Sequence, residues 1–269
     1  MATLPAELWL VIFDYACTDN AVTGASLALV SSYIRALSQK HRLQSIAIRG
    51  RAQIARLACA LEDMPLLYRP RNMLIAVADA EEGYVAPQDV RRILELVAPT
   101  IERLHLHMPQ VASIGIPAAP RLSELAIYGP FIDAPQLLPM LRDLYVLLNG
   151  HRPAALLRDV WRIAPRIQSL YMSQGAATPH DIMLALGISP RDVHGIQRPL
   201  SNVMLMPKSL RLLCIEQEGF NTDIAVAICP RQRQFARKLR ALAAVDLRLK
   251  LAPPQLHDVE PALKFPAER

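Results

Sequence analysis

A short motif of the form Pro-x-(Leu or Ile)-x-x-Leu-x-(aliphatic) recurs along the chain and constrains its fold more than any other feature. Its clean copies begin at Pro99, Pro120, Pro139 and Pro165, and a variant with one extra residue begins at Pro207. The closing Leu-x-(aliphatic) pair predicts a short strand, because alternate residues of a strand point to the same face. One unit of this size cannot close a core of its own, so we expect neighbouring units to stack on one another.

Segments between these strands carry helical patterns, so strand and helix alternate along most of the chain. Strands without the leading proline are predicted at residues 46–48, 73–77 and 245–249, and helices at residues 51–62, 88–98, 154–164 and 222–242. This alternation predicts a mixed α/β fold in which a parallel sheet lines a curved solenoid. The units resemble leucine-rich repeats. Their spacing is irregular and most copies lack the asparagine of such repeats, so we expect a divergent solenoid with a degenerate copy near residues 182–193.

The residues that alternate with the inward-facing pairs should face the opposite side and form a concave surface for a target protein. Tyrosine is prominent among them, and tyrosine is enriched at protein interfaces. The alternative is that Tyr145 and Tyr171, which occupy equivalent positions in their units, only stack on each other. The predicted target-binding residues are Arg103, His105, His107, Glu124, Tyr128, Asp143, Tyr145 and Tyr171, extended by Ser169, Ser173, Glu216, Asp246 and Arg248.

The first fifty residues have a different, wholly helical pattern. Pro5 suits the first turn of a helix, and apolar residues then recur at helical spacing at Leu8, Ile12 and Phe13. Residues 17–24, which end at Gly24, are predicted to connect this helix to a second one with an apolar face of Leu27, Val30, Ile34 and Leu37. A hairpin this small cannot bury all its apolar residues, which predicts a surface for a partner.

Four elements of this region resemble the F-box, in particular the F-box-like proteins of basidiomycete fungi. They are Leu4-Pro5-x-Glu7-Leu8, Ile12-Phe13, the insert Ala16-Cys17-Thr18-Asp19 and Leu27-Ala28-Leu29-Val30-Ser31, so the resemblance covers residues 4–50. In that family a three-helix module docks on the Skp adaptor of Skp, cullin and F-box (SCF) ubiquitin ligases. The resemblance implies adaptor contacts by Leu4, Pro5, Leu8, Ile12, Phe13, Leu29 and Val30. The tryptophan that many F-boxes carry in the third helix is absent, and His41-Arg42-Leu43 stands there instead.

The resemblance implies a two-part chain, with an F-box-like helical module in residues 1–50 and a divergent repeat region in residues 51–269. The expected function is that of a substrate-receptor adaptor in an SCF-type ligase, with the Skp adaptor and the cullin scaffold as partners and an unidentified protein as target. Ubiquitin would be transferred by a separate enzyme, so the chain itself is expected to be no enzyme. The alternative is a non-catalytic interaction scaffold outside any ubiquitin ligase.

Composition narrows the function classes further. Hydrophobic residues make up 52% and charged residues 20% of the chain, which predicts a folded protein. No signal-peptide pattern and no membrane-spanning run is found, so we expect an intracellular protein, cytoplasmic or nuclear, without membrane contact. The net charge is +6, and the densest basic segment contains Arg231, Arg233, Arg237, Lys238 and Arg240. We expect this segment to be a solvated helix face and not a nucleic-acid surface.

No pattern in the sequence favours catalysis. The chain lacks a Gly-x-Ser-x-Gly element, a phosphate-binding loop and a dinucleotide fingerprint. His105 and His107 could ligate a metal on one strand face with Glu124 nearby, but such a pair on a solvated strand is more often polar surface. The four cysteines are scattered and indicate neither a zinc site nor a disulfide framework. We therefore expect no metal and no cofactor.

Overall fold

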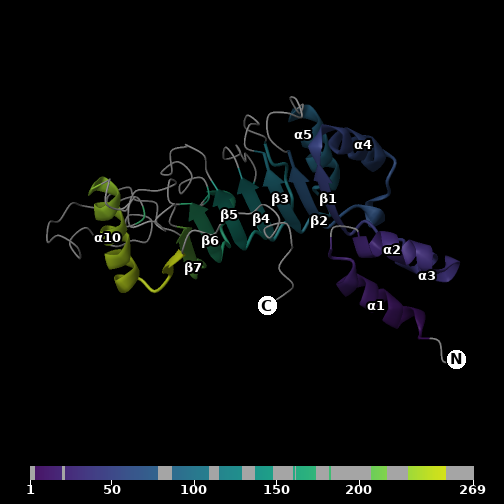
Figure 1. The fold of residues 1–269 in the computed structure, drawn as a ribbon, viewed down its shortest axis with the longest axis horizontal. Coiled ribbons are helices and arrows are strands. Elements are labelled where there is room, and N and C mark those ends of the chain that lie inside the picture. The colour runs from purple at the N-terminus through teal and green to yellow at the C-terminus, as the bar shows by residue number, and fades with distance from the viewer. Residues whose placement is uncertain are drawn as a thin grey trace. The chain divides into compact units, whose positions relative to one another are not determined.

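The computed structural model describes residues 4–19, 22–77, 87–108, 115–128, 137–147, 160, 162–173, 182, 207–216 and 230–252. The fold is mixed α/β, as predicted, and its strands pair in parallel (Figure 1). The chain divides into two compact units between Leu122 and Ser123. Among the described residues, the first unit contains the N-terminal helices and three strands with helices between them, and the second contains five strands and the helix at 230–245. The predicted division at residue 50 into a helical module and a repeat region stays a prediction.

The N-terminal helices enclose a small core of their own. They are α1 (Ala6–Ala16), α2 (Val22–Val30) and α3 (Ser32–Ser38), and Pro5 caps the first of them. Phe13, Cys17 and Ile34 are buried together, and Trp9, Leu27 and Leu37 pack against them from the rim. The ring of Trp9 stacks on that of Phe13 with the centroids 5.6 Å apart. We refer to α1, α2 and α3 together as the helical module.

The second predicted helix is in fact two helices, separated at Ser31. Ser31 has an extended backbone, with φ −162° and ψ 163°, and its side chain accepts a hydrogen bond from the backbone N–H of Ile34. Arg35 reaches back to donate to the carbonyl oxygen of Ala28 near the end of α2. The break turns Val30 out to solvent, whereas Ile34 enters the core. Gly24, predicted to lie in the connection, lies within α2.

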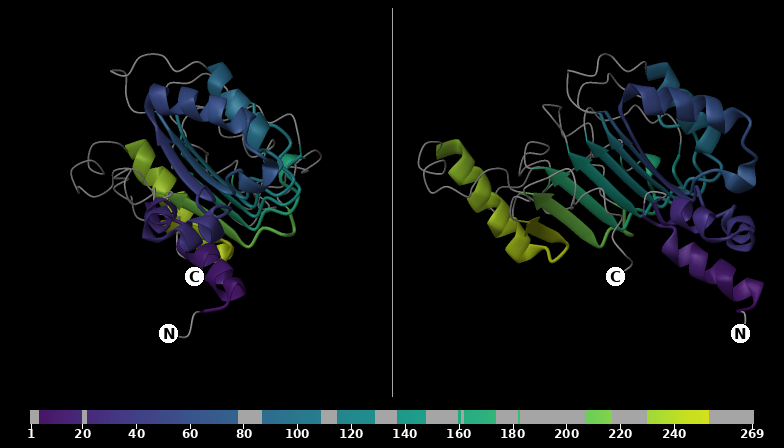
Figure 2. Two further views of the ribbon diagram at one scale, coloured as in Figure 1. Left: turned by 90° about the vertical axis from the view of Figure 1, so that its right-hand side faces the viewer. Right: turned by 45° about the vertical axis from the view of Figure 1, so that its right-hand side comes forward.

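The strands of the first unit form a parallel group in chain order. They are β1 (Ser45–Arg49), β2 (Asn72–Ala76) and β3 (Arg103–His107), and they confirm the strands predicted there. Between them run α4 (Gly50–Glu62), the 3-10 turn η1 (Leu66–Tyr68) and α5 (Pro87–Val97). α4 and α5 lie side by side on one side of these strands (Figure 2). Their apolar faces are buried, which closes the core of this unit.

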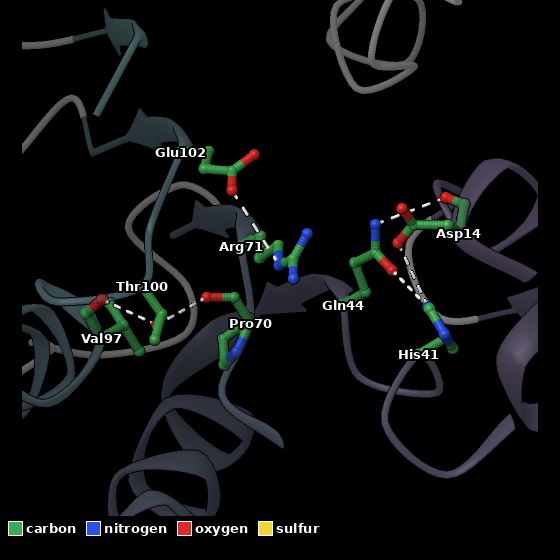
Figure 3. Close-up of polar contacts among 8 residues, drawn as sticks. All are labelled: Asp14, His41, Gln44, Pro70, Arg71, Val97, Thr100 and Glu102. Carbon is green, nitrogen blue, oxygen red and sulfur yellow. Dashed lines mark hydrogen bonds and ion pairs between the residues drawn. The ribbon is translucent and has the colours of Figure 1, made fainter. Parts of the chain in front are cut away.

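Equivalent residues just before successive strands make the same hydrogen bonds. The carbonyl oxygen of Gln44 accepts from the N–H groups of Arg71 and Asn72, and that of Arg71 accepts from Glu102 and Arg103. Figure 3 shows the neighbouring contacts, in which the hydroxyl of Thr100 donates to the carbonyl of Pro70. One shared acceptor per turn satisfies the backbone where each strand begins, which keeps the strands in register.

The second unit repeats this arrangement. Its strands are β4 (Glu124–Tyr128), β5 (Asp143–Leu147), β6 (Ser169–Ser173), β7 (Leu212–Glu216) and β8 (Leu249–Ala252), all parallel to their neighbours. The carbonyl oxygens of Ser123, Arg142 and Gln168 each accept two N–H groups from the following turn. The register places one buried leucine from each strand in a single row: Leu125, Leu144, Leu170, Leu213 and Leu249.

The last predicted strand was placed too early in the chain. α10 (Pro230–Val245) runs to Val245, and β8 begins only at Leu249. Between them the carboxylate of Asp246 accepts hydrogen bonds from the backbone N–H and the guanidinium of Arg248, which fixes a turn. Leu247 is 90% exposed instead of facing inward. The helix predicted at residues 154–164, the degenerate copy at 182–193 and residues 222–229 lie wholly or mostly outside the described residues.

Candidate protein-interaction surfaces

The helical module exposes an unusual amount of apolar side chain. Nine of the fourteen large apolar side chains that are exposed in the described ranges belong to residues 4–33, and each is between 43% and 82% exposed. Isolated exposed leucines are ordinary, whereas nine exposed large apolar side chains within residues 4–33 make the helical module a candidate interaction site. We call this group the helical surface: Leu4, Leu8, Val11, Ile12, Tyr15, Val22, Leu29, Val30 and Tyr33.

The helical surface arises because α1 is apolar on two faces. Trp9, Phe13 and Cys17 follow one another at intervals of four residues, so they share a face that packs on the core. Leu8 and Ile12 are also four residues apart and fall on a different face, which remains exposed. A helix of a small module needs one apolar face for its own core, and the second is then left for a partner.

Six of the seven residues that the F-box resemblance implies as adaptor contacts are exposed, and the seventh is not. Leu4, Pro5, Leu8, Ile12, Leu29 and Val30 are exposed. Phe13 is only 1% exposed, stacked on Trp9 and set edge-on to His41 with ring centroids 6.4 Å apart. Phe13 is therefore a core residue, and we leave it out of the proposed docking surface.

Sequence reasoning missed four members of the helical surface: Val11, Tyr15, Val22 and Tyr33. A signal for two of them was present in the sequence. Val11 and Tyr15 lie three and seven residues after Leu8, so they share its side of the helix. The sequence pattern did not indicate that Val22 and Tyr33 would be exposed. Their exposure depends on the break at Ser31 and on the packing of α2 on α3.

A polar cluster joins α1 to the segment that leads into β1. Nδ1 of His41 lies 3.2 Å from Oδ1 of Asp14 and 3.1 Å from Oε1 of Gln44 (Figure 3). The amide of Gln44 also donates to the backbone carbonyl of Asp14, at 3.4 Å. Ser45 adds a hydrogen bond to the carbonyl of Thr18, just beyond the end of α1. These contacts hold the helix that carries Leu8 and Ile12 against the rest of the first unit.

On β3 the predicted outward residues alternate with buried ones. Arg103, His105 and His107 are half-buried, whereas Leu104 and Leu106 between them are almost fully buried. The alternation inferred from the motif is therefore correct on this strand. Within the described residues no group of three or more metal-ligating side chains comes together.

In the second unit, four predicted target-binding residues lie together on neighbouring strands. Glu124 of β4 is opposite Asp143 of β5, and Tyr145 of β5 is opposite Tyr171 of β6. The two tyrosine rings are stacked, with centroids 4.3 Å apart and an angle of 8° between their planes. The stacking considered as the alternative reading is thus present. We call Glu124, Asp143, Tyr145 and Tyr171 the tyrosine site.

The tyrosine site has a distinctive electrostatic character. Burial raises the pKa of the Tyr145 phenol well above its ordinary value, and Tyr171, Glu124 and Asp143 raise it further. The phenol therefore stays protonated at neutral pH. Two carboxylates close enough to act on Tyr145 give this part of the strand face a negative potential within a chain of net charge +6.

The remaining predicted target-binding residues are placed differently. Tyr128 is half-buried on β4, two residues beyond Ala126, and Ser169 is half-buried on β6 opposite Asp143. Asp246 and Arg248 pair with each other in the turn before β8 and do not face outward from a strand. The side chains of Ser173 and Glu216 lie outside the described residues. Of the basic segment on α10, Arg237, Lys238 and Arg240 are described, and all three are exposed.

No protein-family model, curated protein or solved structure matches this chain. None of the helices within the described ranges is both long enough and apolar enough to cross a membrane.

Proposed function

We propose that this chain is a substrate-receptor adaptor of an SCF-type ubiquitin ligase. The helical surface docks on the Skp adaptor, and the outward residues of the strands hold a target protein. The observation that carries the proposal is the helical surface, in which Leu8, Ile12, Leu29 and Val30 are exposed around a separate core formed by Phe13 and its neighbours. These four residues are among the seven that the F-box resemblance implies as adaptor contacts.

The physical reason to expect tight docking is the apolar area that such a surface removes from water. Burial of apolar surface contributes roughly 25 cal/mol per Å² before the costs of association are subtracted. Large side chains at the centre of an interface contribute most of the binding energy. Leu8, Ile12 and Tyr15, all exposed on α1, would supply such a centre.

The mechanism that follows is proximity. The Skp adaptor links the helical module to the cullin scaffold, and the strand face holds the target beside the enzyme that donates ubiquitin. Tethering converts the meeting of target and donor into an intramolecular event, at an effective concentration of about millimolar for short flexible connections. On this account no residue of the chain forms or breaks a bond.

The test is co-purification of the full chain with a fungal Skp adaptor. The double substitution Leu8→Asp and Ile12→Asp places charge in the helical surface at residues that are 50% and 43% exposed, so the core is spared. The matched control is Leu66→Asp and Leu67→Asp in η1, where the side chains are 54% and 69% exposed but lie outside the helical module.

Binding by the parent and the control, with loss of binding in the Leu8 and Ile12 variant, would support the proposal. If the folded parent does not bind the adaptor, the ligase role is wrong. The chain would then act as a non-catalytic interaction scaffold outside any ubiquitin ligase.

A further inference from the structure

We propose that the tyrosine site binds the guanidinium group of an arginine side chain in the target protein. The inference deepens the target-binding half of the proposed function and rests on it. It begins from the register of β4, β5 and β6, which places two carboxylates in one row and two tyrosines in the next row along the strands. The site is therefore a stacked aromatic pair with Glu124 and Asp143 along one side.

The charge of the site selects a cation. The residues of β4, β5 and β6 that alternate with the buried leucine rows include Glu124, Asp143 and three tyrosines but neither lysine nor arginine. The chain as a whole carries a net charge of +6, so a site with two carboxylates and no lysine or arginine on these strand positions differs in sign from the chain's overall charge. Glu124 and Asp143 can contribute while they keep other contacts, because a carboxylate accepts several hydrogen bonds.

The shape of the site favours arginine over lysine. One face of the Tyr145 ring is covered by Tyr171, and the residue opposite Tyr145 on the other side is Ala126. A methyl group is too small to cover a phenol ring, so the Ala126 side chain covers less of that face than Tyr171 covers of the other. A guanidinium is planar and can stack on an aromatic ring while its N–H groups reach a carboxylate. The ammonium of lysine is compact and strongly hydrated, so it gains less from the same surface.

The site is also held in place before a ligand arrives. The stack with Tyr171, with ring centroids 4.3 Å apart, fixes the orientation of the Tyr145 ring. The carboxylates extend from strands whose backbones are paired in register, so they need little ordering on binding. Less side-chain freedom is then lost when a partner binds, which favours affinity.

The experiment measures binding of fluorescently labelled five-residue peptides to the full chain by anisotropy. Three peptides of glycine and one other residue type are compared, in which that other residue is arginine, lysine or uncharged citrulline. We expect the arginine peptide to bind roughly tenfold more tightly than the citrulline peptide, with lysine between them, and its binding to weaken as salt is raised.

Variants locate the binding on the chain. Tyr145→Ala and Asp143→Asn should each weaken binding of the arginine peptide by roughly tenfold, whereas Tyr145→Phe keeps the ring face and should change it by less than about threefold. Asp63→Asn removes an exposed carboxylate at the end of α4 and is the control for a change of charge alone. Circular dichroism of each variant reports whether it is folded.

Three results would overturn the inference. They are no binding of the arginine peptide, equal binding of the citrulline peptide, and equal effects of Asp143→Asn and Asp63→Asn. The adaptor assay is independent of these results, because Asp143→Asn leaves the helical surface intact. Failure of the adaptor assay with successful arginine binding would reject the ligase role alone, and the reverse would reject the arginine site alone.

Discussion

Nδ1 of His41 lies 3.2 Å from a carboxylate oxygen of Asp14, and this contact connects the segment before β1 to α1. His41 is 6% exposed, and its Nε2 atom is buried without a hydrogen-bond partner among the described residues. The imidazole therefore depends on Nδ1 for its polar contacts, which are Asp14 and Gln44. The position of the helical surface depends in turn on how firmly α1 is held there.

Asp14→Ala should loosen α1 without unfolding the chain. It removes one of the two partners of His41, while Gln44 remains, and Asp14 is half exposed, so water replaces part of the contact. We expect a cost of about 1 kcal/mol. Hydrogen exchange of the α1 amides should accelerate roughly fivefold, while exchange in α4 stays the same. Equal exchange in parent and variant would show that the contact does not hold the helix.

Gly24→Ala should destabilise the helical module although alanine favours helices. A Cβ atom at Gly24 would lie 2.6 Å from the carbonyl oxygen of Arg42 and 2.8 Å from its Cα, both of which are backbone atoms. The module must shift to admit the methyl group, at a cost of about 1–3 kcal/mol. Thermal unfolding followed by circular dichroism measures this, with Ala25→Ser at the exposed neighbouring position as control. A gain in stability would contradict the close packing of α2 on residue 42.

Ser31→Ala should weaken the start of α3. The Ser31 side chain accepts the N–H of Ile34 at 3.1 Å, and loss of such a cap costs about 1 kcal/mol. Ser32→Ala, also exposed and one residue further on, is the matched control and should change stability by less. Ser31→Asn should restore most of the loss because asparagine caps equally well. If the two alanine variants are equal in urea denaturation, the cap at Ser31 contributes nothing.

We expect deprotonation of Tyr145 to lower the free energy of unfolding of the second unit at alkaline pH. Its folded pKa lies above the unfolded value of about 10, so the unfolded chain releases this proton first. The stabilisation of the folded state by protonated Tyr145 is fully present below the unfolded pKa. It is lost as the pH rises from there towards the folded pKa. The free energy of unfolding should therefore fall more steeply above about pH 10 in the parent than in Tyr145→Phe. Parallel curves from chemical denaturation would contradict the burial of this phenol.

The strands could be predicted from the sequence because their signal is local. Each Leu-x-(aliphatic) pair alternates with polar residues, and the alternation alone determines which side chains point inward, as Leu104 and Leu106 show. The stack of Tyr145 on Tyr171 follows from the same reasoning, because equivalent positions of neighbouring units become partners in register. The alternation of apolar and polar residues predicted a strand at residues 245–249, and this was wrong. There the carboxylate of Asp246 accepts a hydrogen bond that forms a turn, which the alternation does not indicate.

The helical module was harder to predict because packing decides its faces. Ile12 and Phe13 are adjacent and similarly apolar, and the packing of Phe13 with Cys17 and Ile34 places Phe13, not Ile12, in the core. The helical periodicity of apolar residues continues from Leu27 to Leu37 across Ser31. The break between α2 and α3 could therefore not be predicted from this periodicity. A side-chain hydrogen bond of one serine decided the outcome.

Calorimetric titration of the full chain with a purified Skp adaptor at several temperatures tests the proposed docking of the helical surface. We expect binding with a negative change in heat capacity, because the helical surface is apolar. Binding should be lost in the Leu8→Asp and Ile12→Asp variant and kept in the Leu66→Asp and Leu67→Asp control. A folded parent that binds no adaptor, or a Leu8 and Ile12 variant that binds as well as the control, would contradict the account.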